Sequence, residues 1–217
     1  CSLPSLVLDY FKSFVEVQHH ILLTHAAEKL HLYQGHRIRV KNQRDRVDEI
    51  VASLLENEAM IVMDFKMKFE SVYFREKMTD FYGKKGLSWH GSMVYSRYTT
   101  AEREACEDLL DYHITYYDHI LSGDSKQDYV AVLSYFDAVC RRITVDFPHV
   151  MHLYVQSDNA RCYKKGNLIF GLYKIALSYR LTLMSYVHTG IQDGKGSIDA
   201  HFTTAMRHVH CFCNMGH

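Results

Sequence analysis

Three aspartates, widely separated along the chain, are the residues with the clearest potential for chemistry. They are Asp64, Asp158 and Asp199. Carboxylate oxygens are the ligands that Mg²⁺ and Mn²⁺ prefer, and two such ions held by shared acids stabilise both the attacking and the leaving oxygen of a phosphoryl transfer. The three aspartates therefore predict a two-metal site, provided that the fold brings them together.

Two of these aspartates also have a purely structural interpretation. Asp158 could cap the helix that follows it, and Asp199 could be a favourable charge in the first turn of a helix. Taken singly, these structural interpretations are the stronger ones. The case for a metal site depends on the three acids occurring together.

The elements around the acids are predicted from the periodicity of apolar residues. Residues 60–63 form a continuous apolar run and residues 64–69 alternate, which indicates a strand that leaves the core at Asp64. Further strands are expected over 87–99, 112–121, 150–156 and 181–187, and helices over 129–147, from about 159 to 179, and from Ser197 onward. Asp64 and Asp158 are then predicted to face each other from adjacent parallel strands.

The predicted order of elements is three strands followed by alternating helices and strands. This order is that of the RNase H-like fold, an α/β mixed sheet flanked by helices, and we expect such a core over 57–217. Residues 1–56 are expected to form a helical lead-in of two or three helices, with a polar run over 41–46. Because the sequence opens at Cys1 and stops at His217 inside a predicted helix, we expect a core truncated at its C-terminus.

The composition is that of an ordinary globular protein. Of 217 residues, 47% are hydrophobic and 23% are charged, which excludes wholesale disorder. Lys and Arg together number 25, as do Asp and Glu, so contacts with nucleic acid must come from local patches. The cysteines are irregularly spaced, and neither a membrane span nor a signal peptide is apparent, so we expect an intracellular protein, nuclear if its source is eukaryotic.

Four segments of the sequence resemble a group of transposase-derived proteins. They are residues 64–70 (DFKMKFE), 82–91 (YGKKGLSWHG), 156–163 (QSDNARCY) and 192–199 (QDGKGSID). The resemblance covers about 33–202 and implies an acidic-triad (DDE/DDD) nuclease and strand-transferase core of the transposase and integrase superfamily. In that pattern Asp64 and Asp158 match the first two acids. Asp199 is taken as the third acid, with Asp193 as its alternative.

Basic residues near these acids are candidate contacts to the phosphates of nucleic acid. Lys66 shares a strand face with Asp64, and a lysine there suits a phosphate better than a further metal ion. The full set of candidates is Lys66, Lys68, Lys84, Lys85, His90 and Lys195. For His90, as for His188 at the end of the last strand, a hydrogen-bonded structural role is the alternative.

The C-terminal tail from His208 to His217 is rich in residue types that bind zinc. Its spacing fits no standard zinc finger, and Cys211 and Cys213 would point about 200° apart on a helix. We therefore expect exposed histidines and buried free thiols in the tail, and no Zn²⁺ site.

Two functions of different classes follow from these observations. The first is a metal-dependent polynucleotidyl transferase or nuclease that cleaves and joins DNA strands with Mg²⁺ or Mn²⁺. The second is a domesticated, catalytically inactive module of the same fold that binds DNA or protein. Both make DNA a candidate partner, need no membrane, and are compatible with a homo-oligomer. The sequence alone does not separate an active site from one that has lost its chemistry.

Overall fold

The computed structural model describes residues 3–69, 77–78, 86–106, 109–121, 126–189 and 197–214. The chain divides into two units, residues 1–47 and residues 48–217. The elements of the first unit are α1 (Leu3–Lys12), a 3₁₀ turn (Val17–His19) and most of α2 (His20–Ser53). No helix in the described part of the chain is both long and apolar enough to cross a membrane.

The described part of the lead-in contains the two helices α1 and α2, in agreement with the two or three that were expected, but the polar run 41–46 does not separate helices. Helix α2 runs without interruption for 34 residues and includes the polar run 41–46. That run contains neither Gly nor Pro, the two residues that most strongly disfavour a helix interior, so its polarity does not end the helix. α2 does contain one glycine, Gly35, outside that run, and the helix tolerates it at a cost of about 1 kcal/mol.

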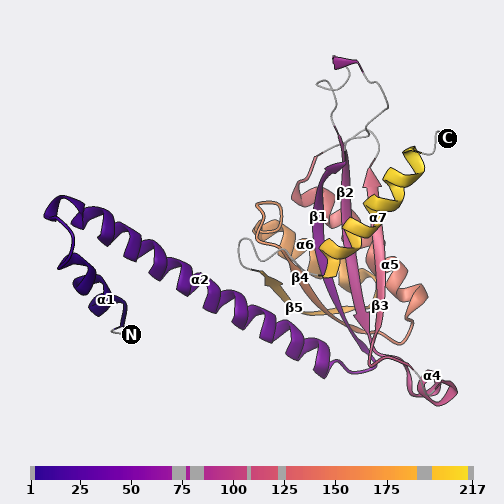
Figure 1. The fold of residues 1–217 in the computed structure, drawn as a ribbon. Helices are drawn as coiled ribbons and strands as arrows, with labels where there is room; N and C mark the ends of the chain where they lie inside the picture. The colour runs from indigo at the N-terminus through magenta and orange to yellow at the C-terminus, as the bar shows by residue number, and fades with distance from the viewer. Residues whose placement is uncertain are drawn as a thin grey trace. The chain divides into compact units, whose positions relative to one another are not determined.

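The second unit is built on a mixed sheet (Figure 1). Within the described residues its five strands are β1 (Glu58–Phe69), β2 (Leu87–Ser96), β3 (His113–Leu121), β4 (His152–Ser157) and β5 (Thr182–His188). They lie in the order β3-β2-β1-β4-β5, with antiparallel pairs β1–β2 and β2–β3 and parallel pairs β1–β4 and β4–β5. This is the RNase H-like topology, so the predicted fold class is confirmed.

Helices cover both faces of this sheet. Helices α5 (Tyr129–Asp146) and α6 (Gly166–Ser178) pack on one face, and α7 (Ser197–Asn214) crosses the other (Figure 1). A short helix, α4 (Thr100–Ala105), follows β2 and was not predicted. Its signal was present in the sequence, because Thr99 and Glu102 form a reciprocal capping box at its start.

Because side chains alternate along β1, its residues face either the layer of α5 and α6 or the layer of α7. Ala59, Ile61 and Met63 are fully buried in the main core under α5 and α6, whereas Val62 packs with the smaller cluster under α7. Since successive side chains of a strand point to opposite faces, Asp64 shares the face of Val62. The first predicted acid therefore lies on the α7 side of the sheet.

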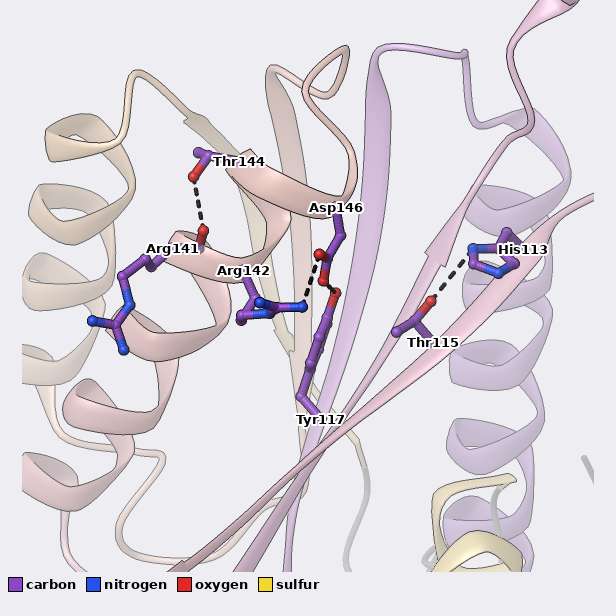
Figure 2. A network of polar contacts seen from close by, with 7 residues as sticks. All are labelled: His113, Thr115, Tyr117, Arg141, Arg142, Thr144 and Asp146. Atoms are coloured by element: carbon purple, nitrogen blue, oxygen red, sulfur yellow. Dashed lines mark hydrogen bonds and ion pairs between the residues drawn. The ribbon is translucent and has the colours of Figure 1, made fainter. Parts of the chain in front are cut away.

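Polar contacts join α5 to the edge strand β3 (Figure 2). The hydroxyl of Tyr117 donates a hydrogen bond to Asp146 Oδ2 at 2.7 Å, and Arg142 forms an ion pair with Asp146 Oδ1 at 2.9 Å. Arg142 is largely exposed, so this ion pair contributes at most about 1 kcal/mol. The contacts orient α5 against β3, while the apolar core supplies most of the stability.

Candidate active site

Asp64 and Asp158 lie on neighbouring parallel strands. In the pairing of β1 with β4, Met63 is opposite Ser157. Asp64 is the next residue along β1, and Asp158 follows directly after the last residue of β4. The predicted adjacency of the two strands is confirmed, and it places both aspartates at the same end of the parallel pair, where ligands of α/β sheets gather.

The carboxyl group of Asp64 is in an unfavourable environment for a negative charge. Burial, followed by the negative charges of Asp158 and Asp199, raises its pKa from the ordinary 3.8 to about 7, against a small opposing effect of a backbone hydrogen bond. Asp158 and Asp199 are therefore each close enough to Asp64 to oppose its negative charge. A proton or a cation at Asp64 would relieve this repulsion.

Asp158 is held in a turn beyond the end of β4. Its Oδ1 accepts a hydrogen bond from the backbone N–H of Ala160 at 3.0 Å. Burial raises the pKa of Asp158, while that hydrogen bond and the nearby His188 and Lys164 act to lower it. The next helix begins only at Gly166 and has Lys165 at its N-cap, so the interpretation of Asp158 as a helix cap is wrong.

Asp199 lies in the first turn of α7, as expected. The helix is anchored beside it by Ile198 and Phe202, which are 5% and 3% exposed and pack against Trp89 and Met93 of β2. A carboxylate in a first helical turn is also favoured by the helix dipole. The alternative third acid, Asp193, lies outside the described residues.

Polar and aromatic groups on β2 and β3 hold α7 against the sheet through hydrogen bonds and a ring stack. The ring of His201 donates a hydrogen bond from Nε2 to Asp118 Oδ2 at 2.6 Å and stacks on Tyr116 with 4.0 Å between ring centroids. The indole N–H of Trp89 donates to the other oxygen of Asp118 at 2.9 Å. One aspartate thus links the sheet to the helix that carries Asp199.

Gly91 on β2 allows α7 to approach the sheet closely. In the strand pairing it stands opposite Asp64. A Cβ at this position would lie 2.6 Å from the ring of Phe202, well inside van der Waals contact. The glycine therefore permits the approach of α7 at the same point along the sheet as the first acid.

Lys66 is close to this group but is engaged with α7. Its Nζ donates a hydrogen bond to the backbone carbonyl of Phe202 at 3.3 Å and lies 5.2 Å from the ring centroid of Trp89. Burial lowers its pKa. Lys68, two residues further along the strand, is exposed. Phosphate contacts by these two lysines stay predictions.

The predicted contact of His90 with nucleic acid is wrong. Its side chain is 0% exposed, and burial together with His119 lowers its pKa to about 3. The ring stacks on Tyr135 at 4.6 Å and lies edge-on to Phe65 at 4.8 Å, on the main-core side of the sheet. Alternation along β2 could have shown this, because His90 lies between Trp89 and Gly91, which face α7.

Three of the remaining nucleic-acid candidates lie outside the described residues. They are Lys84, Lys85 and Lys195.

Sequence reasoning missed several polar groups that line the end of β4. The hydroxyl of Ser157 lies 2.8 Å from the hydroxyl of Tyr186 and 3.2 Å from Nδ1 of His188. Tyr186 donates onward to the backbone carbonyl of Tyr163 at 3.2 Å. Their place at the ends of predicted strands could have indicated them, because Ser157 and His188 are paired at the ends of two parallel strands. This network orients His188 beside Asp158.

The chemical type of the donor atoms fits a metal ion, whereas their arrangement does not yet provide three ligands for one. The carboxylates are hard oxygen donors, and the charges of Asp158 and Asp199 oppose that of Asp64, which fits a divalent cation such as Mg²⁺. Among the described residues, however, no three His, Cys, Asp or Glu side chains are arranged so that they could hold an ion together. Asp158 and Asp199 thus lie near enough to affect Asp64, but the three acids do not form a closed ligand set as they stand.

Comparisons with known proteins give a family without an assigned function. A family model described as "Domain of unknown function (DUF8701)" matches residues 43–213. No curated protein matches the chain.

Similar solved structures include three Mos1 assemblies. The pre-cleavage Mos1 transpososome is 10% identical with a TM-score of 0.40, and the match covers 95% of this chain and 64% of that chain. The Mos1 transposase paired-end complex with left transposon end is 9% identical with a TM-score of 0.41, covering 96% and 64%. The Mos1 strand transfer complex is 8% identical with a TM-score of 0.38, covering 96% and 63%. These are distant similarities, and this chain spans less than two thirds of each Mos1 chain.

Proposed function

Because the chain belongs to the DUF8701 family, whose description assigns no activity, we propose its function from the site: a metal-dependent nuclease and strand transferase of the DDE/DDD transposase class, acting on DNA. The single observation that carries the proposal is the electrostatic coupling of three aspartates on an RNase H-like sheet. Burial and the charges of Asp158 and Asp199 raise the pKa of Asp64 to about 7. Perturbed carboxyls gathered at the end of parallel strands are typical of functional sites.

In this proposal Asp64, Asp158 and Asp199 hold Mg²⁺ or Mn²⁺. The bound metal supplies an activated oxygen nucleophile and stabilises the leaving oxygen of a phosphodiester. Since the described acids do not form a closed ligand set, binding includes a small approach of the third acid toward the other two. Asp199 is the acid best suited to this approach, because it is carried by a separate helix and not by the sheet.

Burial raises the pKa of Asp158, and neighbouring groups offset part of that rise in favour of the ionised form that binds metal. His188 and Lys164 both act to lower its pKa. Lys164 also provides a positive charge in the loop after β4, where a phosphate of the substrate would approach. We extend the proposal to this lysine as a contact to the DNA backbone, alongside Lys66, Lys68, Lys84, Lys85 and Lys195.

The second candidate function is a module of the same fold that binds DNA or protein without cleaving it. It is favoured by the lack of a closed ligand set among the described residues. It is also favoured by the balance of 25 basic and 25 acidic residues, which produces no strong general attraction to DNA. An inactive descendant of a nuclease would keep the fold and lose selection on the distances between its acids.

The test is metal-dependent nicking of supercoiled DNA, measured with Asp-to-Asn variants. Asn keeps the shape of the side chain and removes its charge, so Asp64→Asn and Asp158→Asn should abolish nicking while the circular dichroism spectrum is unchanged. Asp199→Asn should be nearly as damaging and Asp193→Asn mild. The reverse order for the last two would move the third ligand to residue 193.

A matched control is Asp111→Asn, because Asp111 is an exposed aspartate outside the site. It should nick DNA at the rate of the unmodified protein. Calorimetric titration with Mn²⁺ adds a reading that does not depend on turnover, and the unmodified protein should bind the ion whereas Asp64→Asn should not. A protein that neither nicks DNA nor binds Mn²⁺ belongs to the second candidate class.

A further inference from the structure

The first unit, residues 1–47, leaves an unusual amount of apolar surface in water. None of its described side chains from residue 6 to residue 47 is buried. Twelve large apolar side chains in this stretch are exposed, namely Leu6, Val7, Tyr10, Phe11, Phe14, Val17, Ile21, Leu22, Leu30, Leu32, Tyr33 and Ile38. Soluble monomers rarely show a continuous apolar patch larger than a few hundred Å².

The hairpin of α1 and α2 covers only part of this surface. Its turn is fastened by His20, whose Nε2 lies 3.0 Å from the backbone carbonyls of both Lys12 and Val15. Between the helices runs an apolar groove of about 450 Å³, lined by residues that include Phe11, Leu23 and Leu30. The hairpin therefore leaves the facing apolar side chains of its two helices incompletely covered.

The outer side of α2 also carries exposed apolar side chains. Ile21 and Leu32 are 80% and 68% exposed and share one helix face at a spacing of eleven residues, about three turns. A second groove of about 390 Å³ lies beside Ile21 and is lined also by Thr24 and Glu28. A helix with apolar residues on more than one face is stable only when several neighbours cover it.

The area and the charge of this surface fit a second copy of the same chain. With roughly 100 Å² exposed on each large apolar side chain, the eleven up to Tyr33 offer on the order of 1,000 Å², above the roughly 800 Å² per partner of a stable interface. Between residues 6 and 33 the charged residues are three acids and two bases, so two copies would hardly repel each other. Those residues are Asp9, Lys12, Glu16, Glu28 and Lys29.

We propose that residues 3–33 are a homodimer interface, in which two α1–α2 hairpins related by a two-fold axis associate as a four-helix bundle. The two-fold arrangement is self-complementary, so each apolar face is covered by the same face of the partner. The basic stretch from Arg37 to Arg46 lies beyond this interface along α2, where close pairing of two copies would be repelled. The proposal does not depend on the activity of the acidic site.

Sedimentation velocity of the full chain at micromolar concentration tests the proposal. The unmodified protein should sediment as a dimer. The double variant Ile21→Glu/Leu32→Glu should be a monomer, with a dissociation constant at least about 100-fold higher, because burying four unpaired carboxylates per dimer is strongly unfavourable. Neither residue lines the groove between α1 and α2, so the helical circular dichroism signal should persist.

The matched control is Val145→Glu, at an apolar residue of α5 that is 66% exposed. It should leave the dimer intact. A monomeric unmodified protein would overturn the proposal and assign the hairpin surface to another partner. A dimer that survives the double variant would overturn it too, by locating the contact between copies elsewhere.

Discussion

The two faces of the sheet are held in different ways. Under α5 and α6 lies a large apolar cluster that includes Phe136, Leu172 and Val139, all 0% exposed. Under α7 the buried cluster has four members among the described residues, supplemented by the hydrogen bonds of Asp118. The stability of the second unit is therefore concentrated on one face, and the other face carries a helix that can move at modest cost.

This difference separates the three acids into two classes. Asp64 and Asp158 are attached to β1 and β4, which are central strands between the main core and α7. Asp199 is attached to α7 and depends on the smaller cluster. A site built in this way can hold two ligands rigidly and regulate the position of the third.

The largest expected effect is on the main-core face. Phe136→Ala should lower the free energy of unfolding by about 4 kcal/mol, because it leaves a cavity in a fully buried cluster. Phe202→Ala, on the α7 face, should cost about 2 kcal/mol, since α7 can detach without unfolding the sheet. Urea denaturation followed by circular dichroism measures both. Equal losses of unfolding free energy would mean that α7 unfolds together with the sheet, as the main-core face does.

The next effect concerns the charge of Asp64 and its dependence on pH. Its folded pKa of about 7 exceeds the ordinary 3.8, so between these values the folded state binds more protons and stability falls as pH rises. Asp64→Asn should therefore stabilise the metal-free protein, increasingly from pH 4 to pH 7 and by a constant amount above. We expect on the order of 2 kcal/mol at pH 8, after allowing for solvent screening.

Thermal unfolding over this pH range, with and without Mg²⁺, measures the effect. Mg²⁺ should stabilise the unmodified protein at pH 8 and leave Asp64→Asn unchanged. A variant whose advantage is the same at pH 4 and pH 8 would show that the carboxyl is not under electrostatic strain.

Two glycines allow a matched comparison of the faces. A Cβ at Gly91 would lie 2.6 Å from the ring of Phe202, and a Cβ at Gly171 on α6 would lie 2.6 Å from the side chain of Leu133. Gly91→Ala should displace α7 and weaken Mn²⁺ binding about tenfold, with a stability loss of about 1–2 kcal/mol. Gly171→Ala should leave Mn²⁺ binding unchanged, because Leu133 can adopt another rotamer on the far face. Similar Mn²⁺ affinities for both variants would show that the position of α7 does not affect metal binding at the site.

The smallest expected effect is that of removing His201, which links α7 to Asp118 and Tyr116 of β3. His201→Ala removes a hydrogen bond and a ring stack that are partly exposed, and it should cost about 1 kcal/mol. Trp89 is the single tryptophan of the chain and packs under α7, so its fluorescence reports the docking of that helix. The variant should change the emission of Trp89 while the far-ultraviolet circular dichroism stays the same. Unchanged emission would show that the apolar cluster alone holds α7.

Several features of this protein were predictable from local patterns. The change from a continuous apolar run to alternation placed the strand β1 and the face of Asp64, because a strand has a period of two. The order of strands and helices indicated the RNase H-like topology, since few connections are compatible with that order. The capping box at Thr99 was equally readable but was overlooked.

Other features were decided only by tertiary packing. His90 is buried between Phe65 and Tyr135 because the sheet and α5 close over it; alternation along β2 indicates which face of the sheet the ring takes, but not that α5 covers it there. Lys66 is bound to α7, a helix more than a hundred residues further along the chain.

The acidic site shows the same division. Periodicity indicated that Asp64 and Asp158 end neighbouring strands, but the distance of Asp199 from them depends on how deeply Phe202 seats against Gly91. Local sequence determines which face a side chain takes, because that follows from the geometry of one strand or helix. Which side chains then meet depends on contacts between distant segments, and those are set by the packing of the whole unit.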